Sequence, residues 1–206
     1  MWPETQPTQE LLDRARRGEA DAVERLLDRH REPVRRVIAL RLDPAIVQRV
    51  DASDVVQDVL LEASRRLQDY LKNPVMPFHL WLRHIAKDHL IDAHRKHHQA
   101  AKRGVEREQP LARAGWDERS SLDLAGQLFD QELTPASAAI RNELQGRLQT
   151  AMQALAEDDR EVLLMRHFEQ LGNQEIAQAL GLTEAAASMR YLRAIRRLRD
   201  LLNPTG

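Results

Sequence analysis

Apolar residues recur every three or four positions along most of the chain, the spacing that gathers them on one face of an α-helix. Between residues 8 and 103 this spacing predicts four helices, with apolar stripes at Leu11–Ala15, 22–42, 55–63 and 78–91. Asp51 or Ser53 is positioned to cap the third helix. The segment 70–77 contains two prolines, so it is expected to lie outside the helices, because proline has no amide hydrogen and restricts the residue before it.

The helical spacing fades between residues 104 and 135, where glycine, proline and acidic residues are scattered. Such a stretch predicts a linker. Trp116, Leu122, Leu124, Leu128 and Phe129 nevertheless indicate that some of it packs against another part of the chain. A second helical block follows from residue 136. We therefore expect an all-α protein with two small domains, 8–103 and 136–206, joined by a flexible acidic linker over 104–135.

Residues 173–202 have the pattern of a helix-turn-helix. Asn173 is expected to cap a short helix, Gly181 to provide the positive φ of the turn, and Thr183 to cap the second helix. The second helix turns Ala187, Tyr191, Ala194 and Leu198 inward. Its opposite face is expected to present Glu184, Ser188, Arg190, Arg193, Arg196 and Arg197. Short polar residues followed by arginines suit a major groove, with base edges met first and phosphates later. A solvated amphipathic helix is the alternative, since arginine also favours helix.

Composition excludes several classes of protein. The 206 residues contain no cysteine, which rules out disulfides and thiolate metal sites. We find no apolar run long enough to span a bilayer and no apolar stretch typical of a signal peptide at the N-terminus, so a soluble, cytoplasmic protein is expected. The formal net charge is −1, so any nucleic-acid binding must come from local basic patches.

Two predicted helices carry charged faces. In residues 51–67, five polar or acidic residues lie opposite the valines: Asp51, Asp54, Gln57, Asp58 and Glu62. No pocket-forming glycine loop accompanies them, which argues against an acid/base or metal site. The helix from Phe78 is basic. His94 and His98 lie one turn apart on it, the spacing of a two-histidine metal site, but no cysteine or suitable glutamate accompanies them. We interpret the histidines as surface groups near phosphates, whose protonation would tighten DNA binding below pH ~7, and expect no metal and no cofactor.

Four stretches together resemble the sigma-70 family of RNA polymerase sigma factors, in its small extracytoplasmic-function type. They are ARRGEADAVERLLDRH (15–30), DASDVVQDVLLEASRRL (51–67), the helix at 78–103, and 148–202. The resemblance implies a protein without catalytic activity that binds core RNA polymerase, recognises the −35 and −10 promoter elements and helps to open the promoter. A stand-alone helix-turn-helix regulator is the alternative function. An enzyme acting on nucleic acid would need a nucleophile or metal-binding carboxylates near the basic face, and no convincing set is present.

The resemblance also implies roles for particular residues. The face that docks on core polymerase corresponds to Asp54, Gln57, Asp58 and Leu61. The segment from Leu71 to Pro77 corresponds to the one that captures a flipped base. The matching candidates for the −10 element are Asn73, Arg83, Lys87, Arg95 and Lys96. The recognition helix for the −35 element corresponds to the second helix of the helix-turn-helix, which carries Arg190, Arg193, Arg196 and Arg197. An anti-sigma factor is a further possible partner.

The chain departs from the family pattern in the second block. Ala156 stands where a proline is common, and Asp158 or Asp159 is expected to cap the helix there instead. Ala185, Ala186 and Ala187 replace the glycine, threonine and valine that the family often has in the recognition helix. Met189 and Ile195 occupy positions that are normally polar, which leaves apolar surface open. These departures bear on the promoter sequence rather than on the fold.

Overall fold

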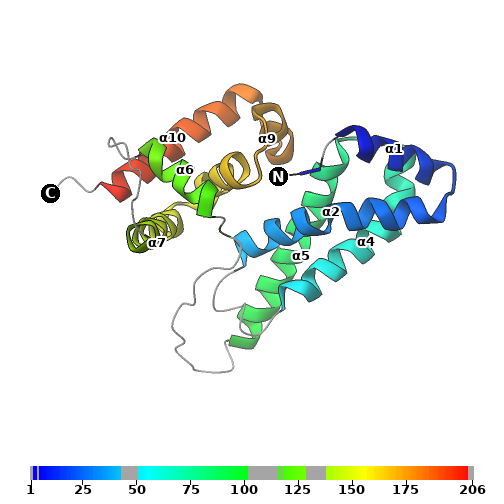
Figure 1. Cartoon of the computed structure of the whole chain (residues 1–206), viewed down its shortest axis with the longest axis horizontal. Coiled ribbons are helices and arrows are strands. Elements are labelled where there is room, and N and C mark those ends of the chain that lie inside the picture. Colours follow the sequence, from blue (N-terminus) through cyan, green and yellow to red (C-terminus); the bar gives the residue numbers. More distant parts are fainter. Residues whose placement is uncertain are drawn as a thin grey trace. The chain divides into compact units, whose positions relative to one another are not determined.

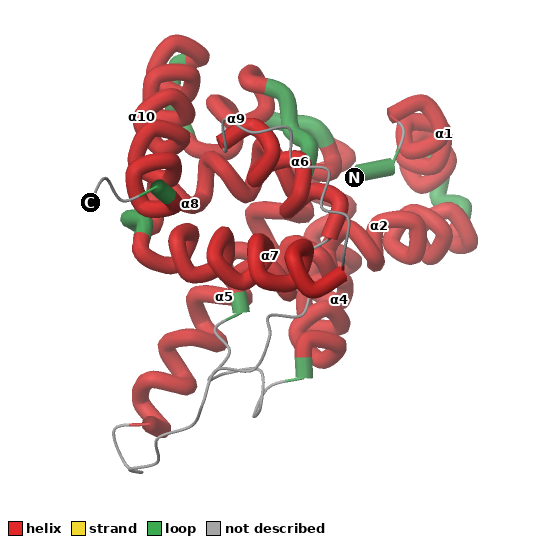
Figure 2. Tube along the Cα trace, turned by 60° about the vertical axis from the view of Figure 1, so that its left-hand side comes forward, coloured by secondary structure: helices red, strands yellow, loops and turns green. Residues whose placement is uncertain are grey.

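A computed structural model describes residues 2–3, 5–42, 51–101, 116, 118–128 and 138–203. Every element of regular structure in these ranges is a helix (Figures 1 and 2). The chain divides into two compact units, Met1–Gly115 and Trp116–Gly206. None of the helices in the described ranges is long and apolar enough to cross a membrane.

In its described residues, the first unit packs four helices around one core. They are α1 (Thr5–Arg16), α2 (Ala20–Arg41), α4 (Ala52–Lys72) and α5 (Phe78–Ala101). Helices α2, α4 and α5 pack against one another, and α1 packs mainly on α2. Their inward stripes supply a continuous cluster of buried aliphatic and aromatic side chains, including Leu26, Ile38, Val59 and Leu82. The apolar spacing of the sequence thus predicts the correct core.

Capping residues fix the ends of α4, which carries part of the candidate site. The Asp51 side chain accepts a hydrogen bond of 2.8 Å from the Ser53 amide, so Asp51 is the cap. At its other end the helix continues through Leu71 and Lys72, and the loop begins only at Asn73. The expectation that residues 70–77 are all irregular is therefore wrong, because the first proline stands at Pro74 and leaves the preceding turn intact.

The second unit contains a helix where a linker was expected. Helix α6 (Glu118–Leu128) packs on α7 (Ala138–Ala154), on a π-helical turn at Leu164–Phe168 and on α10 (Glu184–Leu202). Leu124 and Leu128 are buried in it. Trp116 is also buried, with its ring centroid 4.7 Å from that of Phe168. The boundary expected at residue 136 is therefore wrong, since the second unit begins at Trp116.

The helix-turn-helix consists of α9 (Asn173–Leu180) and α10. Gly181 adopts a φ of +63° between them, and the Thr183 hydroxyl accepts a hydrogen bond from the Ala186 amide, as predicted. Asn173 does not cap α9. Gly172 holds that position, and the Gly172 amide donates to the Glu175 carboxylate at 2.7 Å. Asn173 instead joins the two helices, because its side-chain amide donates to the Glu184 carbonyl at 3.0 Å.

Candidate functional site

The acidic face of α4 is exposed along its length. Asp54, Gln57 and Asp58 are exposed, and Leu61, one turn further along, has 51% of its surface accessible although it is a large apolar residue. Residues spaced three and four apart share a helix face, so these four side chains lie together. Neither Asp54 nor Asp58 forms an ion pair with any residue in the described ranges, whereas neighbouring Glu62 pairs with Arg66 at 2.6 Å. The two carboxylates are thus available to cations of a partner.

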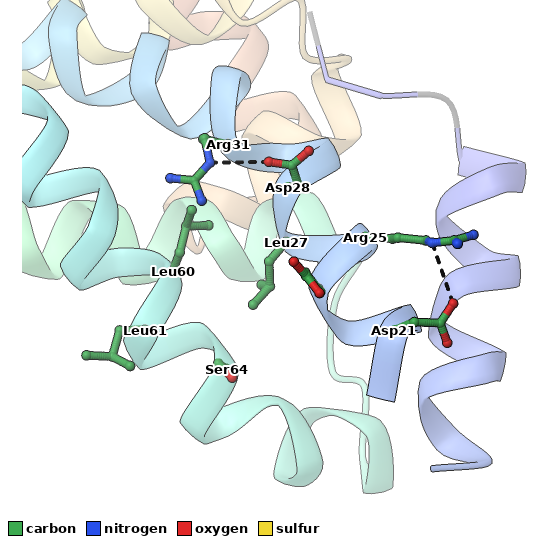
Figure 3. A pocket seen from close by; sticks show the side chains of 9 residues that line it. Asp21, Arg25, Leu27, Asp28, Arg31, Leu60, Leu61 and Ser64 are labelled. Atoms are coloured by element: carbon green, nitrogen blue, oxygen red, sulfur yellow. Dashed lines mark hydrogen bonds and ion pairs between the residues drawn. The ribbon is translucent and has the colours of Figure 1, made fainter. Parts of the chain in front are cut away.

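A groove of about 590 Å³ opens beside this face, between α2 and α4 (Figure 3). Its walls mix exposed charges with the apolar side chains of Leu27, Leu60 and Leu61. The arginines that line it are paired with carboxylates of the same helix, Arg25 with Asp21 at 3.5 Å and Arg31 with Asp28 at 3.4 Å. Glu24 also lines the groove, which leaves its rim acidic. The α4 face and the groove therefore offer one surface that joins apolar contact with negative charge.

The loop at residues 73–77 links α4 to α5 and is largely exposed. The Tyr70 hydroxyl donates to the Met76 carbonyl of this loop at 2.9 Å. The Tyr70 ring packs against Trp81 at 4.8 Å and Phe78 at 5.5 Å between centroids. Trp81 is only partly buried, but it packs on the core as the sequence predicts. Asn73 stands at the start of this loop with its side chain in solvent.

Among the described residues, α5 presents fewer exposed cations than the sequence predicts. Arg83 is only 1% exposed, so the expectation that it lies on a DNA-facing surface is wrong. It falls within the buried stripe of α5, next to Leu82. Lys87 is half-buried, and Arg95 is exposed 3.7 Å from Asp92. The side chain of Lys96 lies outside the described residues.

The histidines of α5 do not form a uniform surface row. Burial lowers the pKa of His84, and the neighbouring Arg83 charge lowers it further. Its Nε2 atom is buried and has no hydrogen-bond partner among the described residues. His84 therefore does not fit the expectation that the histidines of this helix are surface groups near phosphates. The side chain of His98, the second member of the expected pair, lies outside the described residues.

Two carboxylates of α8 (Glu157–Leu163) hold the flank of the recognition helix α10. Arg190 lies 3.1 Å from Asp158 and is only 24% exposed, and Arg197 pairs with the buried Asp159. Both arginines were expected on the outward face. Arg190 is instead largely covered, whereas Arg197 stays exposed, with 60% of its side-chain surface accessible, although it is paired. Neither carboxylate caps α8 as predicted: Ala156 is the residue at that position and no side chain caps the helix. The pairs instead fix how α10 is rotated on α8.

A second contact anchors α10 at its middle. Tyr191 Oη lies 3.2 Å from Nε2 of His167, which belongs to the π-helical turn, and the Arg166 guanidinium lies 5.6 Å from the centre of the Tyr191 ring. Burial lowers the pKa of His167 to about 4, so the ring is neutral at pH 7 and one of the two groups donates its hydrogen to the other.

The outward face of α10 follows from these anchors. Arg193 and Arg196 are exposed and make no ion pair with any residue that the structure describes. Met189 and Leu192 share that face and are 56% and 46% exposed. Glu184 is exposed at the first turn, and Ser188 is half-buried. The helix therefore presents apolar side chains first and unpaired cations later.

Comparison with known proteins identifies the family. Residues 26–100 match the sequence profile of Sigma-70 region 2, and residues 145–198 match that of Sigma-70, region 4, so the two matches together span more than half of the chain. The chain belongs to the sigma-70 family. It is a promoter-specificity factor of that family, of the extracytoplasmic-function type, that acts with core RNA polymerase and promoter DNA.

Individual relatives agree with this assignment. ECF RNA polymerase sigma factor SigD of Mycobacterium tuberculosis is 26% identical over 189 residues, which cover 92% of this chain and 81% of SigD. RNA polymerase sigma-H factor of Pseudomonas aeruginosa is 26% identical over 95% of this chain and 94% of its own length. The probable RNA polymerase sigma factor RfaY of Xanthomonas campestris is 33% identical, but the match covers only 36% of RfaY. Among solved structures, CnrH in complex with the cytosolic domain of CnrY has the same fold, with a TM-score of 0.61 over 97% of this chain and 99% of that one at 23% identity.

Proposed function

We propose that this sigma factor docks on core RNA polymerase through the face of α4 formed by Asp54, Gln57, Asp58 and Leu61. The observation that carries the proposal is the exposure of Leu61 beside two carboxylates that no described residue neutralises. An interface commonly buries an apolar centre within a charged rim that guides the partner. The adjacent groove between α2 and α4 also combines apolar side chains with carboxylates, so it favours a basic partner surface.

The promoter contacts of the first unit follow from its loop and from α5. We propose that the loop at 73–77 receives an unpaired base, with Asn73 donating or accepting hydrogen bonds at its edge. Lys87 and Arg95 would meet backbone phosphates beside it, and Lys96 is assigned the same role from its place on α5. Arg83 is left out because its side chain is buried.

The second unit is proposed to bind the −35 element through α10. Glu184 and Ser188 lie at its N-terminal end and are assigned to base edges, while Arg193 and Arg196 are assigned to phosphates. The exposure of these two arginines and their lack of an ion pair with any described residue support this division. Arg190 and Arg197 would act indirectly, because their pairs with Asp158 and Asp159 hold the helix in its rotation.

We propose that the protein acts in the cytoplasm, where core RNA polymerase is found, and that a regulatory protein covering one of these faces is a further partner. CnrH, which shares the fold, is seen in complex with the cytosolic domain of CnrY. The same contact in this chain would mask the faces assigned above to polymerase or DNA.

The assignment of the arginines can be tested by the salt dependence of promoter binding. Each phosphate contact contributes about 0.9 to the slope of log affinity against log salt. We expect the holoenzyme with Arg193→Ala and Arg196→Ala to bind all promoters more weakly, with a slope shallower by about two. Arg119→Ala, which removes an exposed arginine of α6, is the matched control. An unchanged slope in the double variant would contradict the assignment.

A further inference from the structure

The outward face of α10 begins with apolar side chains where a base-reading helix commonly has polar ones. Ala185, Met189 and Leu192 follow one another at spacings of four and three, and all three are exposed. Met189 and Leu192 are among the most exposed large apolar residues of the described chain. Exposing two such side chains on one face costs free energy in the unbound protein, which makes their place on the recognition helix informative.

The charges around this apolar pair indicate which kind of partner covers it. Arg193 follows Met189 by one helical turn, and Arg196 follows Leu192 by one turn, on the same face. Neither arginine forms an ion pair with a described residue, whereas Arg190 on the flank is held by Asp158. An apolar patch with unpaired cations at one end complements a groove that is lined by base edges and bordered by phosphates.

In the major groove the only apolar group that a base pair offers is the 5-methyl of thymine. Any other base edge presents hydrogen-bond donors or acceptors, and covering those with an aliphatic side chain leaves them unsatisfied. We propose that Met189 and Leu192 read thymine methyl groups in the −35 element. The inference rests on the proposed −35 role of α10 and specifies what that helix recognises.

Geometry limits how the two contacts are arranged. Residues three apart in a helix are about 4.5 Å apart along its axis, close to the ~3.4 Å spacing of stacked bases in one strand. Met189 and Leu192 therefore meet methyl groups on neighbouring base pairs. Ala185, one turn before Met189, adds little bulk and lets the start of the helix approach the groove.

Deoxyuridine provides the direct test, because it differs from thymidine only in lacking the 5-methyl. Promoter fragments are first selected with the holoenzyme from a pool randomised at the −35 element. Each thymine of the selected element is then replaced singly by deoxyuridine, and equilibrium binding of the holoenzyme is measured. We expect one or two positions at which the replacement weakens binding about fourfold, which corresponds to ~0.8 kcal/mol for one buried methyl.

Variants of α10 assign these positions to side chains. Met189→Ala is expected to abolish the deoxyuridine effect at one position and Leu192→Ala at its neighbour, since each removes the contact from the protein side. Leu201→Ala shortens another exposed aliphatic residue, at the far end of the same helix, and should retain both effects. Exposed positions in a helix tolerate alanine, so all three variants should fold.

Three outcomes would overturn the inference while leaving the proposed function intact. A selected −35 element without thymine, or one in which no deoxyuridine weakens binding, would mean that the apolar pair faces something other than DNA, such as a protein partner. Deoxyuridine effects that persist unchanged in both alanine variants would assign the methyl contact to other residues. In each of these cases the holoenzyme still selects promoters, so the proposed function stands. A holoenzyme that selects no promoter would overturn both.

Discussion

A substitution at Leu124 tests whether helix α6 unfolds together with the rest of the second unit or detaches from it separately. The side chain is fully buried, with 0% of its surface exposed. Leu124→Ala removes three carbon groups, worth about 2.4 kcal/mol of transfer free energy at ~0.8 kcal/mol each. The cavity left behind adds to this, and such substitutions cost ~2–5 kcal/mol in total. We expect a loss of about 3 kcal/mol, a large share of the ~5–15 kcal/mol typical of a whole domain.

Hydrogen exchange read by mass spectrometry can locate this loss. If α6 belongs to the cooperative unit, the slowest amides of α7 and α8 exchange only when the whole unit opens, and their protection should fall roughly hundredfold for a loss of about 3 kcal/mol. The slowest amides of α2, in the other unit, should not change. Leu122→Ala is the matched control, because Leu122 lies on the same helix but is only half-buried, and it should cost under ~1 kcal/mol.

A different pattern would refute the reasoning. If Leu124→Ala speeds exchange within α6 alone and leaves α7 and α8 unchanged, α6 is a separately detaching helix. The second unit would then be stable without it, and the packing of Trp116 on Phe168 would contribute nothing to its core.

Two further predictions concern stability. Gly181 has a φ of +63° and open space where a Cβ would stand, so Gly181→Ala should lower the free energy of unfolding by ~1–2 kcal/mol through backbone strain alone. Gly181→Asn should cost less. Equal urea midpoints for the wild type and Gly181→Ala would contradict this prediction. Burial lowers the pKa of His30 and of His167 to about 4, against ~6.5 in the unfolded chain. The unfolded chain therefore binds more protons between these values, so the free energy of unfolding should be greatest above pH ~6.5 and fall as the pH decreases toward 4. Urea midpoints against pH measure this, and His167→Gln should flatten the profile of the second unit only.

Helical spacing was sufficient to predict the long helices α2, α4, α5 and α10, because their buried stripes are regular. The turn of the helix-turn-helix was equally predictable from Gly181 and Thr183, whose conformational and capping preferences are strong. The helix in the expected linker was missed. Its short apolar stripe is diluted by acidic residues and by Gly126, and it is stabilised by tertiary contact rather than by its own propensity. Trp116 and Leu124 were the available signal.

The sequence predicts which helices carry the candidate site, but not which of their side chains are buried, paired or exposed. Arg83 looks like the other cations of α5, and only the packing of three helices shows that it is buried. Arg190 and Arg197 depend on carboxylates of α8, about 30–40 positions earlier in the chain, a pairing that sequence spacing does not encode. The π-helical turn that brings His167 to Tyr191 likewise has no simple sequence pattern. The exposed apolar pair on α10 was partly visible, since Met189 stood out as apolar at a normally polar position.

Co-elution with core RNA polymerase on a sizing column tests whether this chain docks on the polymerase through α4. The native chain would be compared with a variant carrying Asp54→Arg and Asp58→Arg, and with Glu10→Arg, which reverses an exposed charge on α1. We expect the native chain and Glu10→Arg to elute with the core, whereas the double variant should elute alone although it is folded. If the double variant co-elutes as well as the native chain, the docking face is not on α4. If the native chain does not co-elute and yet binds specific duplex DNA tightly by itself, it acts as a stand-alone regulator.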